Sequence, residues 1–162
     1  MEIVRQPKII RTVIEKVWAK NKYDIMARGY EYYKSISKGL RQGDLDDVFE
    51  LLVHTRSTPY KKKAVINTCE HIWGYFKNKA SAEEKGHFFQ LLRDCKNVKD
   101  EEFQSIPNEM MKVMDYVRYL LVAYPNDYLQ GSYFLFSASE WNEVVVKHDA
   151  YVWKDYKVWI KR

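Results

Sequence analysis

One helical stretch of the sequence carries the polar side chains best suited to chemistry, those of Asn67, His71 and Asn78. At about 100° per residue they share one stripe with Gly74, opposite an apolar face. That face consists of Val65, Cys69, Ile72 and Phe76. Glycine inside a helix costs roughly 1 kcal/mol relative to alanine, so Gly74 predicts that a second helix or a ligand approaches this backbone closely. His71 has the side chain of a general acid or base, but the adjacent Glu70 points about 100° away, so the two form no dyad.

Polar residues also interrupt the apolar stripe of the first predicted helix, at Asn21, Asp24 and Arg28. Burying these groups unpaired would be costly, and the i, i+4 spacing of Asp24 and Arg28 predicts an ion pair. Two interpretations remain open, a structural polar network and a groove shared with the His71 helix. The shared site would contain Asn21, Lys22, Arg28, Asn67, His71 and Tyr75.

The remaining candidate nucleophiles and metal ligands have spacings that match no common site. Cys69 and Cys95 form no CxxC motif, and the position of Cys69 on an apolar face predicts a buried, inert thiol. No two histidines have the i, i+4 spacing of a metal site, and no glycine-rich phosphate loop is present. We therefore assign no catalytic residue, no metal and no cofactor.

Helical periodicity runs through most of the chain and predicts an all-α domain of six or seven helices with short connections. Pro7 suits the first turn of the first helix, Asp44 is a good N-cap, and Ser81 to Glu84 has the form of a capping box. The signature helix, which carries the stripe, is expected to run from Pro59 to about Lys79.

The segment 138–162 is ambiguous. Val144–Val146 favours a strand, whereas the spacing of Trp153, Tyr156 and Trp159 suits a helix, and we assign this tail to a helix. We expect residues 1–137 to form one domain, with 138–162 an extension packed on it or flanking it. Because no window reaches roughly 18 apolar residues and the amino terminus has no apolar leader, we expect a cytoplasmic protein outside the membrane.

The charge distribution favours a polyanionic partner. The net charge is +5, and basic residues flank both ends of the polar stripe. Arg56 and Lys61–Lys63 precede it, and Lys77 and Lys79 follow it. The thirteen tyrosines add side chains that can stack on bases or hydrogen-bond phosphate.

Three segments resemble the signature blocks of the YbgA-like domain, a bacterial domain of no assigned function. They are residues 17–28, residues 67–77, and Tyr128-Leu129 followed by Phe134-Leu135, and the resemblance spans about residues 8–137. The chain departs from the family pattern at Asn21, where the family usually has His, and at Ser132, where it usually has Gln. The family's Pro-Leu-x-Val-Pro-Leu segment is hardly recognisable around Ile106-Pro107.

The resemblance implies a role with RNA. YbgA-like domains occur alone or fused behind an iron–sulfur desulfidase domain that acts on thiolated uracil or thiouridine, and the YbgA-like part is implicated in holding tRNA. This chain lacks the desulfidase cysteines, so the resemblance implies non-catalytic binding of tRNA or other structured RNA, accessory to thiouridine metabolism, with a desulfidase-like protein as a further partner. The expected RNA-binding residues are Lys22, Arg28, Arg56, Lys61, Lys62, Lys63, Asn67, His71, Tyr75, Lys77 and Lys79.

Two other functions remain open from the residues alone. In the first, the polar stripe and Gly74 form a helix–helix contact of a protein-interaction or dimerisation module, and the positive charge serves solubility. In the second, a small-molecule enzyme uses the groove of Asn21, Arg28 and His71. Salt-dependent binding of tRNA separates RNA recognition from both, because phosphate binding weakens steeply as salt rises.

Overall fold

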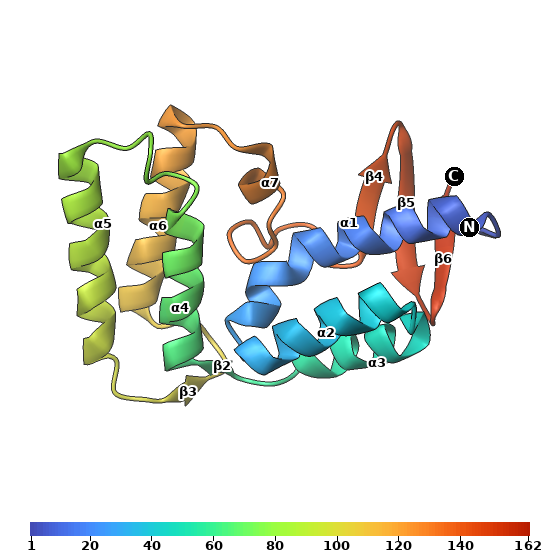
Figure 1. Cartoon of the computed structure of the whole chain (residues 1–162), viewed down its shortest axis with the longest axis horizontal. Coiled ribbons are helices and arrows are strands. Elements are labelled where there is room, and N and C mark those ends of the chain that lie inside the picture. The colour runs from blue at the N-terminus through green and yellow to red at the C-terminus, as the bar shows by residue number, and fades with distance from the viewer.

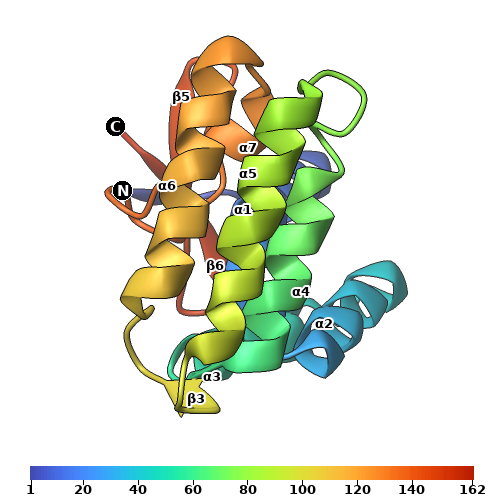
Figure 2. The same ribbon diagram turned by 90° about the vertical axis from the view of Figure 1, so that its left-hand side faces the viewer.

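The computed structural model describes all 162 residues and consists of two lobes joined by a long first helix (Figure 1). One lobe contains the first three helices and a four-stranded sheet, and the other contains α4, α5 and α6, which lie side by side in Figure 2. The helices are α1 (Pro7–Met26), α2 (Tyr30–Gln42), α3 (Leu45–Arg56), α4 (Lys62–Trp73), α5 (Ala82–Asp94), η1 (Cys95–Asn97, a 3-10 turn), α6 (Asn108–Ala123) and α7 (Asp127–Gln130). None of them is long and apolar enough to cross a membrane.

The strands form two antiparallel sheets. The larger has the order β1-β6-β5-β4, and the smaller pairs β2 with β3. The strands are β1 (Glu2–Ile3), β2 (Tyr60–Lys61), β3 (Glu102–Phe103), β4 (Glu143–Val146), β5 (Asp149–Lys154) and β6 (Lys157–Lys161). The first strand of the chain therefore pairs with the last, through Glu2 opposite Ile160 and Ile3 opposite Trp159.

Helix α1 contributes to two separate hydrophobic cores. Its amino-terminal part supplies Val13, Ile14 and Val17 to the core between α2, α3 and the larger sheet. Its last turns supply Tyr23 and Met26 to the core of the other lobe, which α4, α5, α6 and the segment around Phe134 complete. Both lobes are thus built on one continuous helix, whose direction fixes how they face each other (Figure 1).

The fold is α+β, and our all-α prediction is wrong at the tail. Residues 143–161 form three strands, although the spacing of Trp153, Tyr156 and Trp159 suggested a helix. A two-residue loop explains the difference, because Asp155 and Tyr156 both adopt positive φ, 52° and 66°. This is the backbone conformation that a tight hairpin requires, and here it occurs without the glycine that usually signals it.

The apolar face of the signature helix is confirmed. Val65, Ile72 and Phe76 are at most 1% exposed, whereas Lys63 and Asn78 face solvent. The predicted end of this helix near Lys79 is wrong, since α4 ends at Trp73 and residues 74–79 form turns. The expectation of a second helix against Gly74 is wrong, because within 4 Å a Cβ there would meet only the carbonyl oxygen of His71, at 3.1 Å.

Replacing Trp153 by alanine should cost about 3–5 kcal/mol in the free energy of unfolding. The ring is 1% exposed and packs edge-on against Phe49, 5.0 Å between centroids, where β5 meets the helices. Urea denaturation followed by circular dichroism measures the loss. Val145→Ala, at a position of β4 that is 60% exposed, is the control and should cost less than about 1 kcal/mol. Equal losses for the two variants would contradict the packing described for the sheet.

Candidate functional site

A buried ion pair lies at the carboxyl end of α1, between Asp24 in the last turn and Arg28 just beyond it. The guanidinium Nε of Arg28 donates to the carboxylate of Asp24 at 3.2 Å, and both side chains are at most 10% exposed. The other guanidinium nitrogens donate to the Thr58 carbonyl oxygen and, at 2.9 Å, to the Tyr60 hydroxyl. The Tyr60 hydroxyl in turn donates to Asp24. The predicted pair of Asp24 and Arg28 is confirmed, and its remaining hydrogen-bonding groups are satisfied by the chain itself.

A second polar contact lies one turn earlier on α1. The Asn21 side-chain amide donates to the carbonyl oxygens of Val17 and Trp141, each at 2.8 Å. The guanidinium of Arg56 lies over the rings of Tyr133 and Trp141, 4.9 and 4.6 Å from their centroids. These contacts hold the segment that leads from α7 to β4 against α1 and α3, so Asn21 and Arg56 have structural partners.

A different group of side chains gathers between the two lobes, on α1, α2, α4, the turns after α4, and α7. We call it the junction cluster, and it consists of Trp18, Lys22, Tyr23, Tyr30, Tyr33, His71, Tyr75 and Tyr128. Its centre is Lys22, whose ammonium lies 5.7, 5.6 and 5.9 Å from the ring centroids of Tyr23, Tyr33 and Tyr128. Tyrosine faces attract a cation by about 0.5–1 kcal/mol each at exposed sites. The arrangement holds a half-buried ammonium without a carboxylate partner.

The rings of the junction cluster also contact one another. Tyr30 stacks on both Tyr33 and His71, with centroid separations of 5.4 and 6.5 Å. The Tyr75 and Tyr128 rings stack at 6.1 Å with an interplanar angle of 13°. Of these rings, Tyr30 and Tyr128 are 44% and 37% exposed, so the cluster presents aromatic surface to solvent.

Two phenols of the cluster, the buried Tyr23 and the partly buried Tyr128, hold their protons more tightly than usual. Tyr23 and Tyr75 share a hydrogen bond of 3.0 Å between their hydroxyl oxygens. Burial, together with this bond, raises the pKa of Tyr23 far above its usual range, and burial raises the pKa of Tyr128 to about 12. Neither phenol ionises near neutral pH, so these tyrosines can pack and hydrogen-bond but supply no base or nucleophile.

A shallow groove on α2 adjoins the junction cluster through Tyr33. The groove has a volume of about 380 Å³ and carries three cations, which repeat at helical spacing on one face. Its lining residues are Tyr33, Lys34, Ser35, Ser37, Lys38 and Arg41. At the carboxyl end of α2 the chain turns into an acidic stretch, Asp44, Asp46 and Asp47. The basic surface therefore extends from the groove toward Lys22 and stops at α3.

The structure divides the predicted site residues among several surroundings. Lys22, His71 and Tyr75 belong to the junction cluster, whereas Arg28 makes its hydrogen bonds in the buried network. Lys61 pairs with Glu31 at 3.3 Å, and the ammonium of Lys62 donates to the Lys96 carbonyl oxygen. The rest are the half-buried Arg56 and Asn67 and the exposed Lys63, Lys77 and Lys79.

Sequence reasoning missed the α2 groove and most of the tyrosines around Lys22. A signal for the groove was present, because Lys34, Lys38 and Arg41 follow an i, i+4, i+7 pattern. The convergence of Tyr23, Tyr75 and Tyr128 had no such signal, since these residues come from three segments far apart in sequence.

Groups capable of covalent or metal chemistry do not assemble. No group of three or more histidine, cysteine or acidic side chains is positioned to hold a metal ion. Cys69 and Cys95 are both buried, which raises the pKa of both thiols, that of Cys95 to about 11. His71 stacks on a tyrosine and has no hydrogen-bond partner within the chain. The junction cluster therefore offers a positive charge and aromatic rings to a binding partner.

Arg28→Ala should lower the free energy of unfolding by about 3–5 kcal/mol, because it leaves the Asp24 carboxylate buried without its partner. Arg11→Ala, on α1, is a matched control. Arg11 pairs with Glu15 at the same i, i+4 spacing, but these side chains are 43% and 57% exposed. Arg11→Ala should lower the free energy of unfolding by only about 0.3–0.5 kcal/mol. Chemical denaturation measures both, and similar losses would mean that burial of the pair has no energetic effect.

Alkaline pH should destabilise the fold as Tyr128 titrates. Its pKa is about 12 in the folded chain, against an ordinary value of 10.0, so the folded state holds the proton more tightly. The resulting stabilisation is complete below about pH 10 and is lost as pH rises through about 12. Urea midpoints across this range should fall less steeply in Tyr128→Phe than in Tyr119→Phe, a control on the exposed side of α6. Parallel curves would contradict the burial of this phenol.

No curated protein and no solved structure matches the chain. A family model, described as a protein of unknown function, DUF1722, matches residues 22–137. The match begins at Lys22 and includes the whole lobe of α4, α5 and α6, whereas the larger sheet lies outside it. This agrees with the resemblance to the YbgA-like domain, and the chain belongs to the DUF1722 family.

Proposed function

We propose that this protein binds structured RNA, and tRNA in particular, without catalysing a reaction on it. The observation that carries the proposal is the continuity of the junction cluster with the α2 groove. A half-buried lysine among aromatic rings, of which Tyr128 is exposed, adjoins a row of three cations. Cations position phosphates, and aromatic rings stack on unpaired bases, so one surface offers both types of contact.

The spacing of the basic groups suits a nucleic-acid strand. Lys34 and Arg41 are seven residues apart on one helix, which at 1.5 Å per residue is about 10 Å. The three cations repeat about once per helical turn of about 5.4 Å, so they can contact neighbouring phosphates of one strand. At one end Tyr30 and His71 offer stacking surface, and at the other Asp44, Asp46 and Asp47 repel a further phosphate. The strand would therefore run from α2 toward Lys22.

The family resemblance supports tRNA as the RNA and supplies the wider setting. A YbgA-like chain without a desulfidase domain would act as an accessory in tRNA thiouridine metabolism, in the cytoplasm, alongside a separate desulfidase-like protein. Among the residues expected from sequence, the proposal relies on Lys22, His71 and Tyr75. Lys63, Lys77 and Lys79 are exposed and available as outer phosphate contacts.

Replacing Lys34, Lys38 and Arg41 together by alanine should weaken tRNA binding and reduce the slope of log affinity against log salt by about two to three. A matched control removes the same charge from three exposed lysines on and after α5, Lys85, Lys96 and Lys99. Their loss should leave most of the slope intact. Fluorescence anisotropy with labelled tRNA across a salt series measures both, and circular dichroism verifies folding.

His71→Ala separates stacking from charge. It should weaken tRNA binding with little change in the salt slope, because an aromatic contact releases no counterion. Failure of the unmodified chain to bind tRNA at low salt would refute the proposal. The polar stripe would then favour the protein-interaction function, which sedimentation of the chain alone and with a desulfidase would examine.

A further inference from the structure

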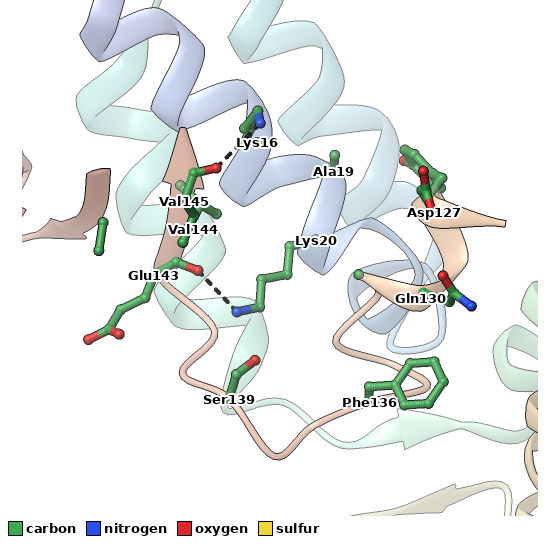
Figure 3. Close-up of a pocket in the computed structure, with 13 residues that line it drawn as sticks. Lys16, Ala19, Lys20, Asp127, Gln130, Phe136, Ser139, Glu143, Val144 and Val145 are labelled. Carbon is green, nitrogen blue, oxygen red and sulfur yellow. Dashed lines mark hydrogen bonds between the residues drawn. The ribbon is translucent and has the colours of Figure 1, made fainter. Parts of the chain in front are cut away.

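A pocket of about 550 Å³ opens between α1, α7 and β4 (Figure 3). It adjoins the junction cluster, because Tyr128 lines the pocket and also lies against Lys22. Its volume is within the range of about 300–1,000 Å³ common for small-molecule sites. The proposed RNA surface therefore borders a cavity large enough for one building block of a nucleic acid.

Two lysines of α1 form the positive wall of the pocket. Lys16 and Lys20 are four residues apart, and Figure 3 shows both reaching toward β4. The Lys20 ammonium donates to the carbonyl oxygens of Glu140 and Glu143, the latter at 3.0 Å. The Lys16 ammonium donates only to the Val145 carbonyl oxygen, at 3.4 Å. An ammonium has three N–H donors, so one remains on Lys20 and two on Lys16.

No acidic side chain forms an ion pair with these lysines, although the charges of Glu143 and Glu140 partly offset the burial that lowers the pKa of Lys20. In Figure 3 the Glu143 carboxylate points away from both of them, and it accepts a 2.9 Å hydrogen bond from Lys161. Asp127 lies on the opposite side of the pocket, on α7 (Figure 3). Charge across the pocket is therefore uneven, with an anion favoured beside α1.

The remaining walls offer a stacking surface and polar groups. The Phe136 ring lines the pocket and is 38% exposed. An exposed aromatic ring of this kind gains by stacking on a base, whatever the base identity. Gln130 and Ser139 add an amide and a hydroxyl to the lining, which can donate to or accept from a base edge.

We propose that this pocket holds one unpaired nucleotide of the bound RNA. The phosphate lies against Lys16 and Lys20, and the base stacks on Phe136 with its edge toward Gln130 and Ser139. This inference rests on the proposed RNA binding and specifies that the RNA contributes a single-stranded nucleotide, from a loop or an end, next to the segment held by α2.

Titration of the ¹⁵N-labelled full chain with uridine and adenosine 5′-monophosphates tests the pocket directly. Each nucleotide should shift the amide resonances of residues 16–20, 128–131 and 143–145. Uridine, adenosine or inorganic phosphate alone should bind more weakly, because each lacks one of the two contacts. Absence of shifts at these amides with millimolar nucleotide, or equal binding of phosphate alone, would overturn the inference.

Substitutions connect the pocket with RNA. Phe136→Ala and Lys16→Ala should each weaken nucleotide binding, and Phe136→Ala should weaken tRNA binding about tenfold, as loss of one stacked base does. Lys16 is chosen because it makes one long hydrogen bond to the chain, at 3.4 Å, whereas Lys20 makes two. Lys8→Ala, exposed on the same helix, is the control.

The two proposals fail in different ways. If tRNA binds but Phe136→Ala leaves its affinity unchanged, the pocket is no part of the RNA site and only this inference is overturned. If the unmodified chain fails to bind tRNA, the proposed function is itself refuted.

Discussion

The buried contact between Arg28 and the residues around it is the constraint on which the geometry of this molecule depends. Arg28 lies just beyond the carboxyl end of α1, and its guanidinium donates to Thr58 and Tyr60, which lie in the connection from α3 to α4. A backbone hydrogen bond from the Lys61 N–H to the Ala27 carbonyl oxygen reinforces the contact. The chain passes from one lobe to the other at this point, so the ion pair fixes where the second lobe begins relative to the first.

The junction cluster depends on this orientation. Its tyrosines come from α1 and α2 on one side and from the turns after α4 and α7 on the other, and Lys22 contacts rings of both groups. A small rotation between the lobes would separate Tyr33 from Tyr128 and leave the ammonium with fewer rings around it. The surface proposed to meet RNA is therefore a product of lobe packing rather than of any single helix, and a buried polar network on the other face of α1 maintains it.

The sequence predicted those features that repeat at short range. The buried face of α4 and the ion pair of Asp24 with Arg28 follow from spacings of three and four residues, and both are confirmed. The tail was predicted wrongly because its decisive feature is a backbone conformation: Asp155 and Tyr156 adopt positive φ without a glycine. The meeting of Tyr23 with Tyr75, 52 positions apart in the chain, follows from tertiary packing and leaves no local pattern.

The pairing of β1 with β6 has a consequence for how the chain reaches this structure. The core beneath the larger sheet combines Val13 and Ile14 near the start of the chain with Val158 and Ile160 near its end. Loop closure over such a separation is entropically costly and slow. During synthesis on the ribosome α1, α2 and α3 emerge early but keep apolar surface uncovered until the last strands arrive. The lobe of α4, α5 and α6, whose contacts are closer in sequence, can fold first. A chaperone would bind the uncovered apolar surface of α1, α2 and α3.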